Sequence, residues 1–370
     1  MDKPRILLAA GGTGGHVYPA ISIADALKEQ NPETEILFVG TRDHMEWRAV
    51  PKAGYDIESI WISGFHRRFT LKNLVFPFKL VTSLAQSLKI LADFRPQVVV
   101  SCGGYAAGPI GWTAGKKGIP VVIQEQNSFP GVTNRLLAKF ATKIFTAFKE
   151  ADRYLPASKT QVTGNPTRAT LTGVDKSVAL SAFGFDDDKP VLLVMGGSGG
   201  AKTINEAMKA NMKRLHDEAG LQIIWQCGSR YYDQLKNEFN AHDYKNLRLT
   251  AFLDNMAEAY AAADLVMSRA GASSCSELML TGKPSVLVPS PNVAGDHQTQ
   301  NAKAMADAGA SKILDDSTMK ETMSDLVEEL IYNQEHLKSM NQAALELAKP
   351  EAAQLIAKEI LEIATSKLDQ

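Results

Sequence analysis

The chain has 370 residues, of which 45% are hydrophobic, and its 40 Lys and Arg side chains nearly balance 41 Asp and Glu side chains. This length exceeds what one hydrophobic core usually supports, so we expect two domains. The near-neutral charge gives no global field that would attract nucleic acid, and three separated cysteines without a CxxC pair favour a reducing compartment over a disulfide framework or structural zinc. No apolar run approaches eighteen residues, so we expect neither a signal peptide nor a membrane-spanning helix.

Short apolar runs alternate with amphipathic segments along the chain, which is typical of βαβ units with buried parallel strands. The runs occupy residues 6–10, 36–39, 98–100, 120–123, 191–195, 223–225, 265–267 and 285–288. The sequence therefore predicts an α/β fold.

The first run leads into a glycine-rich loop, residues 11–15, and the same strand-to-loop sequence recurs at residues 191–200, which indicates two similar halves. Each loop precedes a predicted amphipathic helix, and Pro19 should fall in the first turn of the earlier one, where proline is tolerated. A glycine-rich turn before a helix presents backbone N–H groups and the positive helix end to a phosphate. Two such turns predict a phosphorylated ligand.

Polar residues follow the third and fourth apolar runs, where we expect strands to end. Residues 101–105 read Ser-Cys-Gly-Gly-Tyr, and residues 124–127 read Gln-Glu-Gln-Asn. The carboxyl edge of a parallel sheet is where α/β folds bind ligands, so these residues should lie there beside His16. The cluster indicates a site more strongly than any one member, because a lone His or Glu is more often structural.

A basic and aromatic stretch spans residues 65–89, which hold five Lys or Arg side chains and no acid before Asp93. Trp112, Lys116 and Lys117 extend the same character. Basic side chains among exposed aromatics suit an anionic bilayer surface. A packed helix with a solvated basic face explains the pattern equally well.

Turn residues at 163–166 interrupt the pattern, and we expect the domain boundary there. Pro350 ends a helical run, and residues 352–368 resume one with apolar side chains at helical spacing. The predicted domains are residues 1–164, joined by a C-terminal helix within residues 351–370, and residues 165–350.

Neither glycine loop is a good dinucleotide fingerprint, because Val17 and Lys202 stand where the third small residue belongs. The second strand also ends without the acid that holds the ribose of NAD, so an oxidoreductase is disfavoured. The later loop instead approaches a Walker A motif, with Ala201 in place of its last glycine before Lys202 and Thr203. An NTPase therefore remains an alternative.

The segment from Ser268 to Ser276 follows a predicted strand and carries small hydroxyl residues into the start of a helix, which suits a diphosphate. Glu277 lies about one turn inside that helix, where it could accept both hydroxyls of a ribose or merely favour the helix dipole. Downstream, His297 and Gln298 begin another helix and are either capping residues or readers of sugar hydroxyls.

Taken together, these motifs resemble those of the MurG family of bacterial N-acetylglucosaminyltransferases. The resemblance runs from the first strand to about residue 309, with departures at Gly199, where a larger residue is common, and at His297, often glutamine. It implies a GT-B fold, that is, two Rossmann-like doubly wound domains facing across a cleft, with the last helix returning to the first domain. It rests on residues 11–16, 103–105, 125–127, 164–168, 196–200, 269–272, Glu277 and Gln298.

The resemblance also implies roles for individual residues in binding UDP-N-acetylglucosamine. Ser198 and residues Ala272, Ser273, Ser274, Cys275 and Ser276 would lie near the diphosphate, Glu277 on the ribose, Gln298 on the sugar and the backbone at Leu253 near uracil. Thr13, Gly14, Gly15, Asn127 and Arg168 would complete the donor pocket from the first domain, where Tyr105 is a further substrate-binding residue.

The implied reaction is inverting transfer of N-acetylglucosamine to the C4 hydroxyl of N-acetylmuramic acid in undecaprenyl-diphospho-MurNAc-pentapeptide (lipid I), which gives lipid II. We expect His16 to be the general base, because a neutral imidazole accepts a proton readily at cytosolic pH. Glu125 is the second candidate base. Loop amides, helix ends and Arg168 would stabilise the UDP leaving group, so no metal or other cofactor is expected.

The lipid-linked acceptor implies a peripheral protein at the cytoplasmic face of the cell membrane, in contact with cell-wall and division proteins. Other interpretations of the same motifs are a UDP-N-acetylglucosamine epimerase of GT-B-like fold, a P-loop-like NTPase and a noncatalytic nucleotide-binding module. The epimerase leaves the basic and aromatic stretch without a role, and the NTPase explains only the loop at Gly196.

Overall fold

The computed structural model describes residues 3–42, 44–64, 75–167, 169–197, 199–239, 244–291, 293 and 296–368. The chain divides into two compact units. Unit 1 comprises Met1–Arg168 and Lys349–Gln370, and unit 2 comprises Ala169–Ala348. The sequence placed the corresponding boundaries at 164/165 and 350/351.

In its described part, unit 1 contains a seven-stranded parallel sheet in the order β3-β2-β1-β4-β5-β6-β7. The order reverses between β1 and β4, and such a switch point is where α/β sheets bind ligands. The strands are β1 Arg5–Ala9, β2 Glu35–Gly40, β3 Asp56–Ser59, β4 Val98–Ser101, β5 Val121–Glu125, β6 Ala141–Thr146 and β7 Thr160–Val162. The α-helices are α1 Gly14–Gln30, α2 Glu46–Lys52, α3 Phe76–Phe94, α4 Ala107–Lys116, α5 Val132–Leu137 and α14 Ala352–Leu368.

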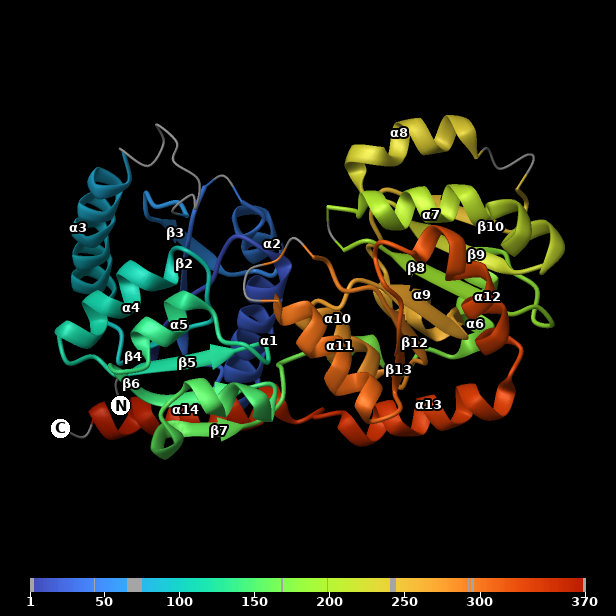
Figure 1. The fold of residues 1–370 in the computed structure, drawn as a ribbon. Helices are drawn as coiled ribbons and strands as arrows, with labels where there is room; N and C mark the ends of the chain where they lie inside the picture. Colours follow the sequence, from blue (N-terminus) through green and yellow to red (C-terminus); the bar gives the residue numbers. More distant parts are fainter. Residues whose placement is uncertain are drawn as a thin grey trace. The chain divides into compact units, whose positions relative to one another are not determined.

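Helices cover both faces of this sheet (Figure 1). Successive strand side chains point to opposite faces, so Ile6 and Leu8 join one core while Leu7 joins the other. The first core packs against α1 and α14, and the second against α3, α4 and α5. Helix α14 lies along α1 and buries Ile356 and Ile360, so the C-terminal segment is part of unit 1 although it follows unit 2 in sequence.

Unit 2 repeats the plan with a six-stranded parallel sheet in the order β10-β9-β8-β11-β12-β13, whose switch point lies between β8 and β11. The strands are β8 Val191–Met195, β9 Gln222–Gln226, β10 Leu247–Thr250, β11 Leu265–Ser268, β12 Ser285–Leu287 and β13 Ser311–Ile313. The α-helices are α6 Lys176–Phe183, α7 Lys202–Lys213, α8 Ser229–Glu238, α9 Met256–Ala262, α10 Ala272–Leu280, α11 His297–Asp307, α12 Met319–Ile331 and α13 Gln334–Leu347. The α/β fold class with two domains is confirmed.

Two local features differ from the sequence interpretation. Helix α1 begins at Gly14, so Pro19 lies inside the helix and not in its first turn. Because proline has no backbone N–H, the Gly15 carbonyl lacks its usual helical donor. Strands β3, β6, β7, β10 and β13 were not foreseen. Four of these lie at sheet edges, where solvent permits polar residues and the apolar run that reveals a buried strand is missing.

Candidate active site

The first glycine loop lies at the switch point of unit 1, between the ends of β1 and β4. A Cβ atom at Gly103 would lie 2.7 Å from the His16 ring, and one at Gly104 would lie 2.3 Å from the Gly11 carbonyl oxygen. Both residues also have positive φ, 98° and 86°, which L side chains rarely adopt. The glycines after β4 therefore let the first loop and His16 pack directly against backbone.

The hydrogen bonds of His16 determine which of its ring nitrogens carries the proton. Its Nδ1 lies 3.1 Å from the Gly11 carbonyl oxygen and 3.3 Å from the Thr13 hydroxyl. A carbonyl oxygen only accepts, so Nδ1 donates to it. In the neutral ring the lone pair is then on Nε2, the nitrogen that could take a proton from a substrate.

A buried acid that sequence reasoning missed, Glu46 at the start of α2, supports the same loop. It accepts hydrogen bonds from the Gly12 N–H at 3.0 Å and from the N–H and hydroxyl of Thr41 at 3.0 and 2.7 Å. The only sequence signal was an acid in the first turn of a short helix, a common and uninformative feature.

Glu125 at the end of β5 is buried, and its two carboxylate oxygens are both engaged. Oε1 accepts from the backbone N–H and side-chain amide of Asn127 at 3.0 and 3.1 Å. Oε2 accepts from the Gly131 N–H at 3.0 Å and from the Asn134 amide at 2.9 Å. A carboxylate with these four donors orders the loop between β5 and α5, a role that competes with proton abstraction.

Other predicted residues of unit 1 lie on the same edge of the sheet. Thr13 is exposed, and Gly14 and Gly15 form the first turn of α1, whose N-terminus has no side-chain cap and no acid among its described residues. Tyr105 is 50% exposed, and its ring lies against Gly64, where a Cβ atom would come within 2.4 Å. Arg168 lies outside the described residues.

In unit 2 the second glycine loop leads from β8 into α7, and Ser198 within it lies outside the described residues. Gly200 has a φ of 72°, and a Cβ atom there would lie 2.1 Å from the Cys227 carbonyl oxygen. By contrast, a Cβ atom at Gly199 would meet nothing within 4 Å. The described part of the N-terminus of α7 has neither a side-chain cap nor a first-turn acid, as an anion site requires.

The N-terminus of α10 has the same character, since its N-cap is Gly271 and its first turn contains no acid. Among the described residues, the buried Ser273 hydroxyl oxygen has no hydrogen-bond partner, an unusual state for a buried polar atom. The Ser276 hydroxyl instead donates to the Ala272 carbonyl. Cys275 is fully buried, which raises the pKa of its thiol to about 12, so this residue can offer a diphosphate only its backbone.

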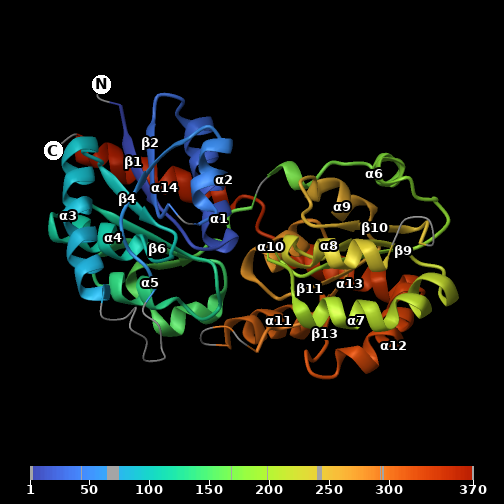
Figure 2. The same ribbon diagram turned by 90° about the horizontal axis from the view of Figure 1, so that it is seen from above.

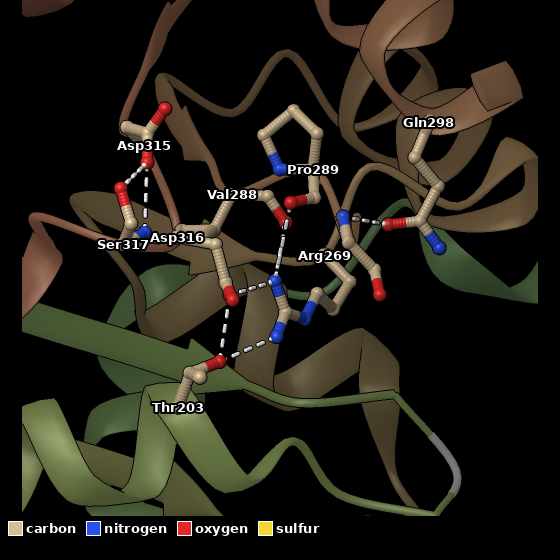
Figure 3. Close-up of polar contacts among 9 residues, drawn as sticks. Thr203, Arg269, Val288, Pro289, Gln298, Asp315, Asp316 and Ser317 are labelled. Atoms are coloured by element: carbon tan, nitrogen blue, oxygen red, sulfur yellow. Dashed lines mark hydrogen bonds and ion pairs between the residues drawn. The ribbon is translucent and has the colours of Figure 1, made fainter. Parts of the chain in front are cut away.

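Glu277 and Gln298, which the sequence assigned to ribose and sugar, are each oriented by a neighbour. The Tyr260 hydroxyl donates to Glu277 Oε2 at 2.8 Å. The Ser290 N–H donates to Gln298 Oε1 at 2.8 Å, so Nε2 is the end of that amide that can donate to a hydroxyl (Figure 3). Leu253, assigned to uracil, lies just after β10 and is partly buried.

A second residue without an assigned role, Arg269, links the loops that follow three strands of unit 2 (Figure 3). Its guanidinium donates to the carbonyls of Val288 and Pro289 at 3.1 and 3.3 Å and is paired with Asp316. It also donates at 2.6 Å to the Thr203 hydroxyl, which in turn donates to Asp316 at 2.6 Å. These contacts hold the start of α7 and the end of β11 in fixed relation.

The same contacts weaken the NTPase interpretation. In a Walker A loop the lysine reaches the phosphates and the following hydroxyl binds magnesium. Here Lys202 is 73% exposed, with its Nζ 3.5 Å from the Glu206 carboxylate, and the Thr203 hydroxyl is held by Arg269 and Asp316.

Helices α3, α4 and α5 form an outer surface of unit 1 (Figure 1, Figure 2). Apolar side chains are exposed on this surface. Phe78 and Val81 on α3 are 71% and 69% exposed. Trp112, Val132 and Leu136 continue this surface on α4 and α5. Phe76, which the sequence grouped with the exposed aromatics, instead packs against the core, and residues 65–74 lie outside the described part of the chain.

Two properties concern the described residues as a whole. No group of three or more His, Cys, Asp or Glu side chains in those ranges is arranged as metal ligands. Within the same ranges, no helix has the length and apolar character needed to span a bilayer.

Comparison with known proteins supplies a family for both units. Residues 6–146 match the glycosyltransferase family 28 N-terminal domain, and residues 191–359 match the glycosyltransferase family 28 C-terminal domain. Among curated relatives, the UDP-N-acetylglucosamine–N-acetylmuramyl-(pentapeptide) pyrophosphoryl-undecaprenol N-acetylglucosamine transferase of Salinibacter ruber is 45% identical over 361 residues, 98% of this chain and 97% of the relative. The enzyme of that name from Bacteroides thetaiotaomicron is 44% identical over 371 residues, 99% and 100% of the two chains.

Solved structures agree with this assignment. The crystal structure of Acinetobacter baumannii MurG has a TM-score of 0.75 at 31% identity and covers 98% of this chain and 100% of its own. A UDP-GlcNAc 2-epimerase from Neisseria meningitidis has a TM-score of 0.67 at 15% identity, covering 97% and 100% of the two chains. The likeness to the epimerase is one of fold alone.

Proposed function

The chain belongs to glycosyltransferase family 28, and from that membership we propose that it transfers N-acetylglucosamine from UDP-N-acetylglucosamine to the MurNAc-pentapeptide of lipid I, forming lipid II. The observation that carries this proposal is the match, over 98% of the chain at 45% identity, to an enzyme named for that reaction. The arrangement of the candidate site residues supports it in each unit.

Unit 2 is the donor-binding unit in this proposal. The N-termini of α7 and α10 stabilise the diphosphate through backbone N–H groups, with the unpartnered Ser273 hydroxyl as an additional donor. Glu277, oriented by Tyr260, accepts from the ribose hydroxyls, and Gln298 donates to the sugar. The groups that bind the diphosphate also stabilise the negative charge that develops on the departing UDP, without a metal.

Unit 1 supplies the base. The C4 oxygen of N-acetylmuramic acid forms a bond to the anomeric carbon of the donor as the bond from that carbon to the UDP oxygen breaks, and the configuration inverts. The hydroxyl proton passes to His16 Nε2, which carries the lone pair when Nδ1 donates to Gly11. Glu125 acts indirectly by ordering the loop that carries Asn127.

The acceptor is attached to a lipid, and we place the protein at the membrane surface through α3, α4 and α5. Exposed apolar side chains on these helices are accompanied by Lys79, Lys89, Lys116 and Arg135, and the only acid on the three helices is Asp93. Apolar side chains beside unbalanced positive charge suit an anionic leaflet.

The reaction is tested by transfer of radiolabelled N-acetylglucosamine from its UDP donor to a short-chain lipid I analogue. We expect transfer by the native chain, and loss of transfer in His16→Ala with UDP binding retained. Glu277→Ala should raise the Kd for UDP roughly tenfold or more, since hydrogen bonds to a charged group contribute about 1.5–3 kcal/mol.

His336→Ala and Glu329→Ala are matched controls, because these residues lie on α13 and α12, which contain none of the candidate site residues. Both should keep native activity. Consumption of UDP-N-acetylglucosamine by the native chain without any transfer would favour an epimerase instead.

A further inference from the structure

One peptide group joins the buried carboxylate of Glu46 to the ring of His16. The peptide between Gly11 and Gly12 has its N–H 3.0 Å from Glu46 Oε2 and its carbonyl oxygen 3.1 Å from His16 Nδ1. The two groups belong to one planar, conjugated unit. The carboxylate and the imidazole therefore occupy the two ends of a continuous chain of hydrogen bonds.

The space around this peptide fits both partners closely. A Cβ atom at Gly11 would lie 2.7 Å from Glu46 Oε1, and one at Gly40 would lie 2.6 Å from Glu46 Cγ. On the other side, a Cβ atom at Gly104 would lie 2.3 Å from the Gly11 carbonyl oxygen. Side chains at these positions would displace either the acid or the peptide, so the glycines preserve the linkage.

Glu46 itself has little freedom to move. It has no exposed surface, and the backbone N–H and hydroxyl of Thr41 both donate to its Oε1, which directs Oε2 toward Gly12. A buried carboxyl group held by three donors is a fixed hydrogen-bond acceptor at one end of the peptide.

We propose that Glu46 is a positioning residue for His16, which polarises the Gly11–Gly12 peptide and thereby holds His16 with its proton on Nδ1 and its lone pair on Nε2. A hydrogen bond accepted from the N–H of a peptide strengthens the acceptor character of its carbonyl, because hydrogen bonds in a chain polarise one another. The stronger acceptor favours the ring tautomer that donates from Nδ1. The idea rests on the proposed function, in which His16 Nε2 takes the acceptor proton.

The test measures the tautomer directly, by nitrogen NMR of the His16 ring in the full-length protein at a pH where the ring is neutral. In the native chain the proton should reside on Nδ1. In Glu46→Gln the side chain keeps one acceptor oxygen and gains an amide that cannot accept, so either Gly12 or Thr41 loses its partner. We expect the fraction of the Nε2–H tautomer to rise.

Thr41→Val is the matched control, because it is nearly isosteric and removes one hydrogen bond to Glu46 without touching the link to Gly12. It should lower the thermal midpoint but leave the His16 tautomer native. Steady-state kinetics give the second readout: Glu46→Gln should lower kcat roughly tenfold or more, with the KM for UDP-N-acetylglucosamine nearly unchanged. A lower kcat with an unchanged KM indicates a misplaced base, whereas loss of donor binding would raise the KM.

A native chain in which the His16 proton resides on Nε2 would overturn the proposal without any variant, even if Glu46→Gln does not fold. A folded Glu46→Gln protein with the native tautomer, or one matched by Thr41→Val in both readouts, would also overturn it. Failure of the proposed function would be seen differently, as absence of transfer by the native chain whatever the His16 tautomer.

Discussion

At the scale of single residues, His16 and Glu125 are the two candidate general bases, and their hydrogen-bond environments differ in a way that the sequence does not show. His16 Nδ1 donates to the Gly11 carbonyl oxygen, which puts the lone pair of the neutral ring on Nε2. Glu125 has both oxygens occupied by donors from its own loop. A base must receive a proton as the reaction proceeds, and a carboxylate already shared among four donors is poorly suited to do so.

We therefore predict that Glu125→Gln acts mainly on stability. The new amide cannot accept, so at least one buried donor loses its partner, at a cost of about 2 kcal/mol. For a unit of this size the thermal midpoint should fall by about 4–8 °C, measured by calorimetry.

Glu150→Gln is the control for this change, because Glu150 lies exposed in unit 1 and should tolerate the substitution. If Glu125→Gln retained its thermal midpoint and lost turnover by a factor of about 100 or more, the loss would identify Glu125 as the base.

At the scale of elements, the glycines of a loop are not equivalent, because only some of them hold positions where a side chain would not fit. In the second loop, Gly200 approaches the backbone after β9 and has positive φ, whereas Gly199 faces open space. The family resemblance marks Gly199 as a position where a larger residue is common, and the open space there agrees with that. The path of the loop into α7 shows why the neighbouring Gly200 is different.

This difference gives a matched pair of substitutions. Gly200→Ala should displace the loop from the N-terminus of α7 and weaken UDP binding about tenfold or more, because the new Cβ atom meets a carbonyl oxygen and the backbone conformation is strained. Gly199→Ala should bind UDP within about twofold of the native chain. Titration calorimetry with UDP compares the two, and equal affinities would contradict a diphosphate site at this loop.

At the scale of the whole molecule, the proposed membrane surface belongs to unit 1 alone. It combines three helices that are separate in sequence but pack side by side, α3 on α4 and α4 on α5 (Figure 1). Phe76 turns into the core while Phe78 and Val81 point outward, so the basic and aromatic stretch contains both a packed and an exposed face. Helix α3 therefore has a packed face and an exposed face, and membrane contact by the exposed face stays a prediction.

The double substitution Phe78→Ser and Val81→Ser should weaken binding to phosphatidylglycerol vesicles about tenfold or more, since each removes apolar surface that the bilayer would cover. Binding should also weaken with added salt. Sedimentation with vesicles measures both effects.

Val178→Ser provides the control, because Val178 is similarly exposed but lies on α6 of unit 2. It should bind vesicles like the native chain. An equal loss in the control and in the double variant would remove the basis for assigning membrane contact to α3.

The sequence by itself determined the α/β fold, the paired glycine loops and the central strands. These depend on local patterns: an apolar run, a glycine turn or a helical period lies within a few residues of chain. Most roles of the candidate site residues came from the family resemblance and stay predictions. The edge strands, the roles of Glu46 and Arg269 and the occupied state of Glu125 were decided only by the tertiary structure. Glu46 meets Gly12 across 34 residues and Arg269 meets Asp316 across 47, and no local pattern encodes which distant donor a buried charge will find. Burial makes such pairing necessary, since an unpaired charge in the interior is costly, but the fold alone selects the partner.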